Sequence, residues 1–368
     1  MSQVAFAVDV SLGENRLFDI ASSRDSCLER FVVLRQLLQA EHIKCDTVDI
    51  CDPGSVDIVV SSDIRTDQKD IISVIKSNPR ARLLYLPTEP EVITAFHDCQ
   101  VLELLPFDKV LFWHDEFVNR VHHAVKCNIG QPVIDPGSIP VVSFEDKKFL
   151  SAISANKFIR HKNGLYEERL KAYDFFGTEK HSLDLFGIGW DQSRLTFVAT
   201  SYRGSCMSKR DVLRNYKFSI CFENATGYPG LITEKIFDCF TAGTVPVYYG
   251  APDIDKYIPD GCYIDFRSFT GYEELYCYLV SMDEREYVRY LDAVKSFLES
   301  PQYYLFTSTC FAKVVSEQID HLLSKPAEIK TVAGFKFSLF KAVCKRPVLM
   351  MKELGRCRKF LFDYLFAW

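Results

Sequence analysis

Residues 216–266 constrain the fold more strongly than any other stretch of this sequence. The short apolar run at 218–222 predicts a buried strand, because polar and glycine-rich residues follow it at once. Residues 224–232 contain two glycines and a proline, which predicts a loop whose backbone can approach a ligand closely. Thr233 is the predicted N-cap of a helix, and residues 245–249 predict a second strand. This strand–loop–helix–strand order is typical of parallel α/β proteins.

The start of that helix has the chemistry of an anion site. A helix N-terminus offers unpaired N–H groups and a partial positive charge, and Lys235 adds a full charge in the first turn, which suits a phosphate or pyrophosphate. Glu234 beside it would accept hydrogen bonds from ribose hydroxyls. In the alternative interpretation, both residues are ordinary first-turn charges in water.

Upstream, apolar runs alternate with helical patterns and predict a doubly wound parallel domain over residues 1–135. We expect its strands at 4–8, 48–50, 58–60, 83–86 and 110–112, and its helices at 26–42, 69–76 and 92–105. Ligands of such domains bind at the carboxyl ends of the strands.

Glu89 lies where the predicted strand 83–86 meets a loop that contains two prolines. A partly desolvated carboxylate at that position would suit a general base. The alternatives are that Glu89 is a solvated loop residue, or that Glu91 has the role. Four histidines offer further acid–base groups that no spacing singles out: His97, His114, His122 and His123.

Residues 131–140 contain three prolines and predict a linker. We therefore divide the chain into a first domain at 1–135, a linker at 136–147, a second domain at 148–325 and a tail at 326–368. In the second domain, 148–154 and 183–187 predict strands, 165–176 predicts a helix that carries Arg169, and 271–325 is helical.

The second domain resembles a known family along three segments that occur in order: FEN at 222–224, TEK at 233–235 and GTVPVYYGAP at 243–252. They are similar to the donor-binding motif of the α-1,3/1,4-fucosyltransferases (glycosyltransferase family 10), and the bacterial type fits best. The resemblance implies a GT-B fold, with two Rossmann-like domains that face a cleft. It also implies an inverting enzyme that moves L-fucose from GDP-fucose to a hydroxyl of an acceptor glycan, in an α-1,3 or α-1,4 linkage.

The resemblance further implies roles for six residues. Glu89 matches the family's glutamate after a strand and would be the general base, and Arg169 matches the arginine that contacts the donor phosphates. The implied donor-binding set is Arg169, Asn224, Tyr228, Glu234 and Lys235. The scheme requires no cofactor or metal, and a divalent cation would be at most stimulatory.

One departure from the family motif leaves the donor open. The family has an aromatic residue two positions before the TEK segment, where this chain has Leu231, and Tyr228 lies nearby. The loop is also one residue longer than is common in the family. Alternatives are therefore a GT-B transferase with another nucleotide sugar, or a non-catalytic nucleotide-sugar-binding accessory protein at the membrane.

The termini and cysteines suggest where such a protein works. Thirteen dispersed cysteines without a CxxC pair favour free thiols in a reducing compartment. The first residues lack the pattern of a signal peptide, and no apolar run approaches the ~20 residues of a membrane span. We therefore expect a cytoplasmic enzyme of glycan synthesis, for example of lipopolysaccharide, another surface polysaccharide or glycoproteins.

The last residues form a basic, aromatic tail. From 330 to 368 there are nine Lys and Arg against two acids, which gives this segment a net charge of +7. Since the whole chain has a net charge of −5, residues 1–329 have a net charge of −12. Residues 350, 354, 357, 361 and 365 would form the apolar face of a helix. Such a tail suits an anionic membrane surface on the inner face of the membrane, and nucleic acid is not expected. Alternatively, it packs on the protein's own acidic body.

Overall fold

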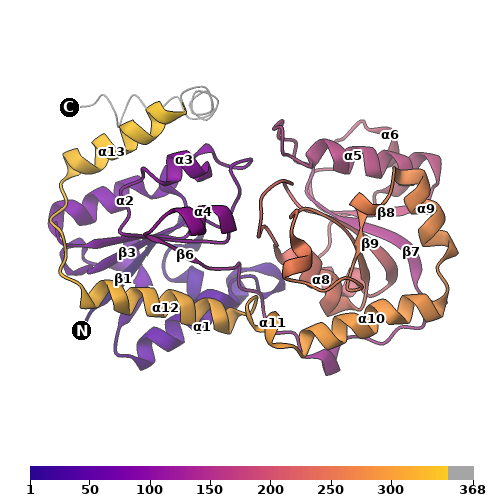
Figure 1. The fold of residues 1–368 in the computed structure, drawn as a ribbon, viewed down its shortest axis with the longest axis horizontal. Helices are drawn as coiled ribbons and strands as arrows, with labels where there is room; N and C mark the ends of the chain where they lie inside the picture. Colours follow the sequence, from indigo (N-terminus) through magenta and orange to yellow (C-terminus); the bar gives the residue numbers. More distant parts are fainter. Residues whose placement is uncertain (347–368) are drawn as a thin grey trace. The chain divides into compact units, whose positions relative to one another are not determined.

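The computed structural model describes residues 1–346 (Figure 1). The chain forms two compact units. Unit 1 contains residues 1–132 together with the chain from Thr307 onward, and unit 2 contains Val133–Phe306. Each unit has its own parallel sheet and its own buried core.

The six strands of unit 1 pair in the order β2-β1-β3-β4-β5-β6, and all of the pairs are parallel. Because the strands are parallel, their carboxyl ends share one edge of the sheet, where a ligand site is expected. The strands are β1 (Gln3–Ala7), β2 (Lys44–Thr47), β3 (Ile58–Ser61), β4 (Arg82–Tyr85), β5 (Lys109–Phe112) and β6 (Ala124–Lys126). The helices between them are α1 (Glu29–Ala40), α2 (Ile64–Ser77), α3 (Cys99–Leu102) and α4 (Asp115–Arg120).

Four of the five predicted strands of this unit are confirmed, and two predicted elements are wrong. Residues 48–50 form a 3-10 turn, and the strand β2 lies just before them. The strand β2 is an edge strand that pairs with β1 alone, so its polar sequence KCDT lacks the apolar run of a central strand. Residues 92–105 hold a short 3-10 turn and α3, because Asp98 caps the amides of Gln100 and Val101 and starts a new helix.

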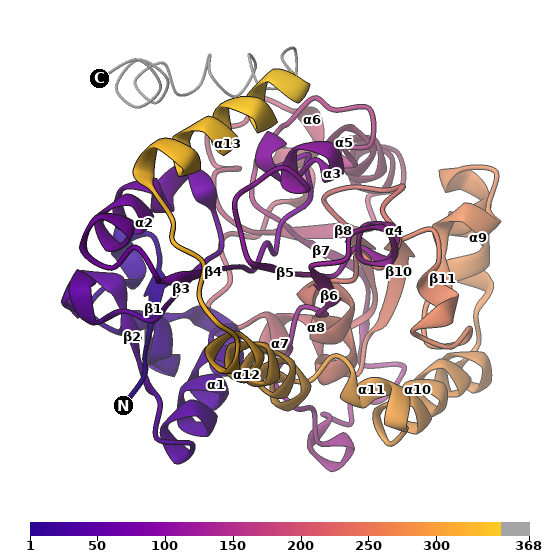
Figure 2. The same cartoon turned by 60° about the vertical axis from the view of Figure 1, so that its left-hand side comes forward.

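Helix α12 (Ser308–Ser324) returns to unit 1 and packs along α1, as both views show (Figure 2). The predicted boundary at 325 therefore lies too late in the chain, and unit 2 ends at Phe306. The reason is the apolar face of α12, where Phe311, Val315 and Ile319 complete the core of unit 1. The fit is close enough that a Cβ at Gly130 would lie 2.6 Å from the Cβ of Phe311.

Helix α13 (Val332–Lys345) contacts α2 and α3 of unit 1 (Figures 1 and 2). Phe335, Leu339 and Ala342 are buried on it, and Arg346 at its end pairs with Asp98 at 2.9 Å. The first part of the tail therefore packs on the protein's own body, and the predicted apolar face at 350–365 lies outside the described residues. Among residues 1–346, no helix has the length and apolar character needed to cross a bilayer.

The five strands of unit 2 pair in the order β11-β10-β9-β7-β8, again all parallel. They are β7 (Lys148–Ile153), β8 (Leu183–Phe186), β9 (Tyr216–Phe222), β10 (Val245–Tyr249) and β11 (Ile264–Asp265). The helices are α5 (Tyr166–Asp174), α6 (Thr196–Ser201), α7 (Lys209–Leu213), α8 (Glu234–Ala242), α9 (Tyr272–Ser281), α10 (Glu284–Leu298) and α11 (Pro301–Tyr304).

Two apolar clusters enclose the sheet of unit 2 from opposite faces. One joins α5 and α9 to the sheet through residues such as Tyr173 and Leu275, and the other joins α8 and α10 through Phe240 and Phe297. Burial on both faces explains why β9 and β10 read as continuous apolar runs. It also fixes the carboxyl end of β9 between two packed layers, where the functional residues gather.

We expect Phe311→Ala to lower the free energy of unfolding of unit 1 by about 3–5 kcal/mol, because it removes a buried ring and leaves a cavity. The ring of Phe311 meets that of Phe31 edge to face at 5.6 Å. Urea unfolding measures the loss, and Lys313→Ala, an exposed position of the same helix, is the matched control. Equal stability of the two variants would show that α12 does not brace unit 1.

Candidate functional site

The site is built on the last residue of β9 and the two residues that follow it. The guanidinium of Arg169, from α5, donates to the backbone oxygen of Phe222 through Nε at 3.1 Å and Nη2 at 2.6 Å. The same Nη2 donates to Oδ1 of Asn224 at 3.0 Å. The end of the strand thereby fixes Arg169 against the loop that leads to α8.

Glu223, between those two residues, has no exposed surface. Its carboxylate accepts from the backbone amide of Thr233 at 2.9 Å, from the Thr233 hydroxyl at 2.7 Å and from Nζ of Lys235 at 3.0 Å. Thr233 occupies the N-cap position as predicted, but its side chain does not cap the helix, since its hydroxyl donates to Glu223 instead. Glu223 therefore links the end of β9 to the start of α8.

The space beside Glu223 has no room for a side chain at position 250. A Cβ at Gly250 would lie 2.5 Å from Cγ of Glu223 and 2.5 Å from the hydroxyl oxygen of Tyr248. That hydroxyl accepts from the amide of Ala251 at 3.0 Å and donates to the carbonyl of Leu231 at 3.4 Å. Gly250 is thus required by the close approach of β10 to the carboxylate, which is the structural reason for the glycine after the run VPVYY.

Glu234 and Lys235 remain charged at neutral pH. Desolvation opposes the ionisation of Glu234, but the charges of Lys235 and Lys209 outweigh it and lower the pKa of Glu234 to about 2. Desolvation also opposes the charge of Lys235, and here Glu223 and Glu234 outweigh it and raise the pKa of Lys235 above its usual value. The exposed fractions of their side chains are 42% and 22%, so both still face solvent in part.

Arg169 differs from its cationic neighbours because its recorded partners are neutral: two oxygens, and the Tyr166 ring at 5.2 Å from the guanidinium carbon. Lys209 pairs with Asp238 at 2.6 Å and Lys235 pairs with Glu223 at 3.0 Å. Within the part of the chain that the structure describes, no carboxylate pairs with Arg169, whose residue is only 8% exposed. Arg169 therefore carries a buried positive charge that an anionic ligand would balance.

The loop between β9 and α8 is held from both sides. Thr226 donates its amide to the Asn163 carbonyl at 2.8 Å, and the amide of Gly230 donates to Oδ1 of the buried Asp253 at 2.9 Å. Tyr228 and Leu231, the two positions that bear on donor choice, are 7% and 1% exposed. The Leu231 side chain is therefore part of the core, and Tyr228 lies closer to the surface.

Glu89, the predicted base, lies in unit 1 after β4. Its side chain is exposed, and its backbone oxygen lies 2.7 Å from Nδ1 of His97. The other predicted residues lie in unit 2, where Arg169 contacts Phe222 and Asn224 and Lys235 contacts Glu223.

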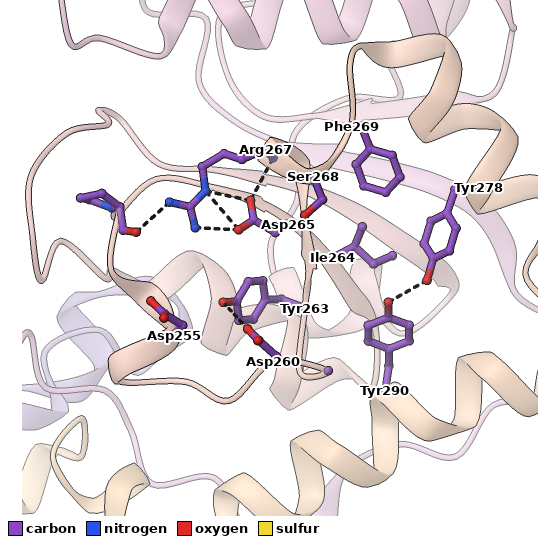
Figure 3. A pocket seen from close by; sticks show the side chains of 12 residues that line it. Asp255, Asp260, Tyr263, Ile264, Asp265, Arg267, Ser268, Phe269, Tyr278 and Tyr290 are labelled. Carbon is purple, nitrogen blue, oxygen red and sulfur yellow. Dashed lines mark hydrogen bonds and ion pairs between the residues drawn. The ribbon is translucent and has the colours of Figure 1, made fainter.

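A separate pocket of about 520 Å³ lies beside β11, at the free edge of the unit 2 sheet (Figure 3). Arg267 points across it to Asp265 at 2.6 Å and to the carbonyl of Pro252 at 2.8 Å, so its charge is already balanced. Asp255 and Asp260 add further negative charge. This lining repels a diphosphate, which leaves the end of β9 as the better anion site.

Sequence analysis assigned no role to two buried residues in or near the site, Glu223 and Tyr173. Glu223 belongs to the FEN segment, and the family resemblance gives it no role. The signal that could have identified it is its position directly after a buried strand, where a carboxylate acts as a buried hydrogen-bond acceptor. Tyr173, on α5, is 2% exposed and donates to the Ser154 hydroxyl at 3.1 Å. Burial raises the pKa of Tyr173, and the positive charges of Arg169 and Lys235 oppose that shift. Its position on an amphipathic helix gives no signal beyond core packing.

Comparison with known proteins identifies the family of the second half of the chain. The sequence profile described as "Glycosyltransferase family 10 (fucosyltransferase) C-term" matches residues 140–332, just over half of the chain. An alpha-(1,3)-fucosyltransferase of Helicobacter pylori is 36% identical over 72 residues, which are 20% of this chain and 15% of that protein. A GDP-fucose protein O-fucosyltransferase 3 of Danio rerio is 39% identical over 84 residues, 22% of this chain and 18% of that protein. The matched segments thus span less than a fifth of these relatives.

Solved structures show the same fold at low identity. An alpha1,3-fucosyltransferase superposes with a TM-score of 0.55 and 14% identity, over 90% of this chain and 92% of that one. The DNA-modifying enzyme beta-glucosyltransferase gives a TM-score of 0.52 and 13% identity, over 86% and 99% of the two chains. The predicted fold class, two parallel α/β units of the GT-B type, is confirmed.

We expect Glu223→Gln to lower the free energy of unfolding of unit 2 by about 1.5–3 kcal/mol, the usual contribution of hydrogen bonds to a buried charged group. Guanidinium unfolding measures it. The matched control is Glu273→Gln, which removes an exposed pair with Lys180 and should change stability by less than about 1 kcal/mol. A loss no greater than that of the control would mean that Glu223 does not join β9 to α8.

Proposed function

Because the chain belongs to glycosyltransferase family 10, we propose that it transfers L-fucose from GDP-fucose to a hydroxyl of an acceptor glycan, with inversion at the anomeric carbon. The observation that carries the proposal is Arg169, a buried guanidinium with neutral partners at the carboxyl end of a parallel sheet. A diphosphate is the ligand that such a group balances best, since guanidinium offers several fixed donors.

We assign the donor to residues around the start of α8. The diphosphate would contact Arg169, Lys235 and the first amides of the helix, where the helix dipole adds to the attraction. The ionised carboxylate of Glu234 would accept hydrogen bonds from the ribose. Asn224 and Tyr228 border the same loop and complete the proposed donor-binding set.

In the proposed reaction, Glu89 of unit 1 takes the proton of the acceptor hydroxyl. The oxygen then attacks the anomeric carbon of fucose, while the bond from that carbon to the phosphate oxygen breaks and GDP leaves with the electron pair. Arg169 and Lys235 stabilise the negative charge that grows on the leaving diphosphate. This scheme uses no metal or other cofactor, and a divalent cation would at most stimulate it.

A second candidate is transfer from another nucleotide sugar within the same fold. Leu231 replaces the aromatic residue of the family motif and is buried, so the loop differs where donor choice is made. A beta-glucosyltransferase studied with uridine diphosphoglucose shares the fold. Side-by-side thermal shifts with GDP, UDP, CMP and GDP-fucose separate the two candidates, because the preferred nucleotide raises the melting temperature most. Binding without turnover would instead support the accessory-protein alternative.

For the donor site, we expect Lys235→Ala to weaken GDP binding about 10- to 150-fold, equivalent to the 1.5–3 kcal/mol of a charge-assisted hydrogen bond. Calorimetric titration measures the dissociation constant. Lys171→Ala is the matched control, because Lys171 is an exposed lysine of α5 that pairs with Glu168. If Lys235→Ala binds GDP as tightly as the control, the proposed donor site is wrong.

For the base, we expect Glu89→Ala to reduce kcat by roughly 10²–10⁴-fold with little change in GDP affinity, the usual share of a general base. Single-turnover kinetics with a soluble acceptor measure it, and Glu91→Ala is the control. Should Glu91→Ala be the inactive variant of the two, the base would be Glu91.

We also propose that the protein is cytoplasmic and binds an anionic membrane surface through its basic tail. The outward face of α13 supports this, since Phe337 and Phe340 are 57% and 45% exposed and Lys341 lies over the Phe337 ring at 4.6 Å. Basic and aromatic side chains on one helix face suit the headgroup region of such a membrane.

We expect the full chain to float with vesicles that contain anionic lipid at low salt and to be released as salt rises, because each basic residue near the surface contributes about 1 kcal/mol. A chain that ends at Arg346 keeps α13 and its pair with Asp98, so it should stay folded but bind less. Neutral phosphatidylcholine vesicles are the control. Failure of the full chain to float with anionic vesicles would refute membrane binding.

A further inference from the structure

The four residues from Pro87 to Pro90 form a fixed loop with one exposed side chain. Both prolines are buried, and their rings fix the φ angles on either side of the pair Thr88–Glu89. Thr88 is partly buried, so Glu89 is the one exposed residue of the four. The loop follows β4 directly, and it therefore presents a carboxylate at the carboxyl edge of the unit 1 sheet.

Two buried ring N–H groups hold the backbone oxygens of that pair. Nε1 of Trp113, just after β5, donates to the oxygen of Thr88 at 3.1 Å. Nδ1 of His97 lies 2.7 Å from the oxygen of Glu89. The donor residues are only 1% and 4% exposed, so both hydrogen bonds are shielded from competing water.

The protonation of His97 follows from its partners. A carbonyl oxygen can only accept, so Nδ1 carries the hydrogen that it donates to Glu89. Nε2 then accepts from the hydroxyl of Tyr85 at 2.9 Å, and the Tyr85 oxygen accepts from the amide of Ile64 at 3.3 Å. A chain of hydrogen bonds thus runs from the start of α2 through Tyr85 and His97 to the backbone of Glu89.

The ring of His97 stays neutral over the working range of pH. Burial lowers the pKa of His97 to about 4 and outweighs Asp63, which raises it, while Arg65 lowers it further. The backbone oxygens of Glu89 and Ser62 favour the protonated ring but do not reverse this shift. The Glu89 carbonyl at Nδ1 and the Tyr85 hydroxyl at Nε2 together favour the Nδ1–H tautomer of the neutral ring, with its donor toward Glu89.

We propose that His97 and Trp113 are positioning residues that hold the Glu89 carboxylate for proton abstraction, with Tyr85 fixing the tautomer of His97. The proposal rests on the proposed role of Glu89 as the base. The ring N–H groups of Trp113 and His97 bind the consecutive carbonyls of Thr88 and Glu89. Because prolines bound this loop on both sides, the two hydrogen bonds fix where the Glu89 carboxylate lies. A general base acts only within hydrogen-bond reach of its proton, so a shift of about 1 Å in the loop is costly.

His97→Phe removes the donor to Glu89 and keeps a ring in the same space. We expect it to reduce kcat by about 10- to 100-fold, while the dissociation constant for GDP, which binds in unit 2, stays unchanged. His97→Asn should recover most of the loss, because its amide nitrogen can replace Nδ1 as the donor. Val315→Ala, a core truncation on α12, controls for loss of stability alone. Trp113→Phe tests the other donor independently if His97→Phe fails to fold.

A double-mutant cycle with Glu89→Ala separates positioning from a purely structural role. If His97 acts through Glu89, the double variant should be no slower than Glu89→Ala, whereas independent effects would multiply. ¹⁵N NMR of the histidine rings should show the Nδ1–H tautomer of His97, and Tyr85→Phe should disturb it.

Three outcomes decide the proposal. If Glu89→Ala is inactive while His97→Phe and Trp113→Phe keep full kcat, the positioning role is refuted and the base assignment stands. If Glu89→Ala is active, the assignment of the base fails first and the positioning role fails with it. If His97→Phe and His97→Asn lose activity only in proportion to their melting temperatures, as Val315→Ala does, the histidine is structural.

Discussion

The architecture of unit 2 at the end of β9 depends on one buried carboxylate, that of Glu223. Removing Glu223 from water costs several kcal/mol unless the charge is paired and hydrogen-bonded, and three donors meet that requirement: the amide and hydroxyl of Thr233, and Nζ of Lys235. These contacts fix where α8 begins relative to β9. The free amides of the helix therefore lie at the carboxyl edge of the sheet, which is where a parallel α/β domain binds its ligand.

The same strand end treats its two buried charges in opposite ways. The negative charge of the Glu223 carboxylate is balanced by Lys235. The guanidinium of Arg169, in contrast, donates hydrogen bonds to the neutral oxygens of Phe222 and Asn224. The first arrangement gives rigidity, because both carboxylate oxygens of Glu223 accept hydrogen bonds and three donors hold them. The second leaves net positive charge in a partly desolvated place, which increases affinity for an anion since the cost of burying the charge has been met during folding. A segment of three residues thus supplies both a structural support and the proposed anion site.

The sequence predicts those features that depend on local pattern. Central strands such as β3, β9 and β10 are apolar runs, and the start of α8 follows from Thr233 and the residues after it. Features that depend on distant partners were missed: the edge strands β2 and β6 lack an apolar run, and α12 belongs to unit 1 only because Phe311 and Val315 meet α1. In the site, the residue types were predictable, but the burial of Arg169 and the role of Glu223 required the packing of α5 and α8 around the strand.

Both units solve one problem by different means, namely how to hold a flexible charged side chain at the end of a strand. In unit 2 the charged groups themselves are gripped, since Arg169 and Lys235 donate directly to the strand end. In unit 1 the carboxylate of Glu89, the proposed base, would have to stay accessible to take a proton. The contacts with His97 and Trp113 accordingly involve backbone oxygens, those of Glu89 and Thr88. A neutral imidazole suits that task better than a cation, because a positive charge beside Glu89 would lower the pKa of the carboxyl group and weaken it as a base. Burial keeps His97 neutral, so in the proposed arrangement His97 can position Glu89 without lowering the pKa of its carboxyl group.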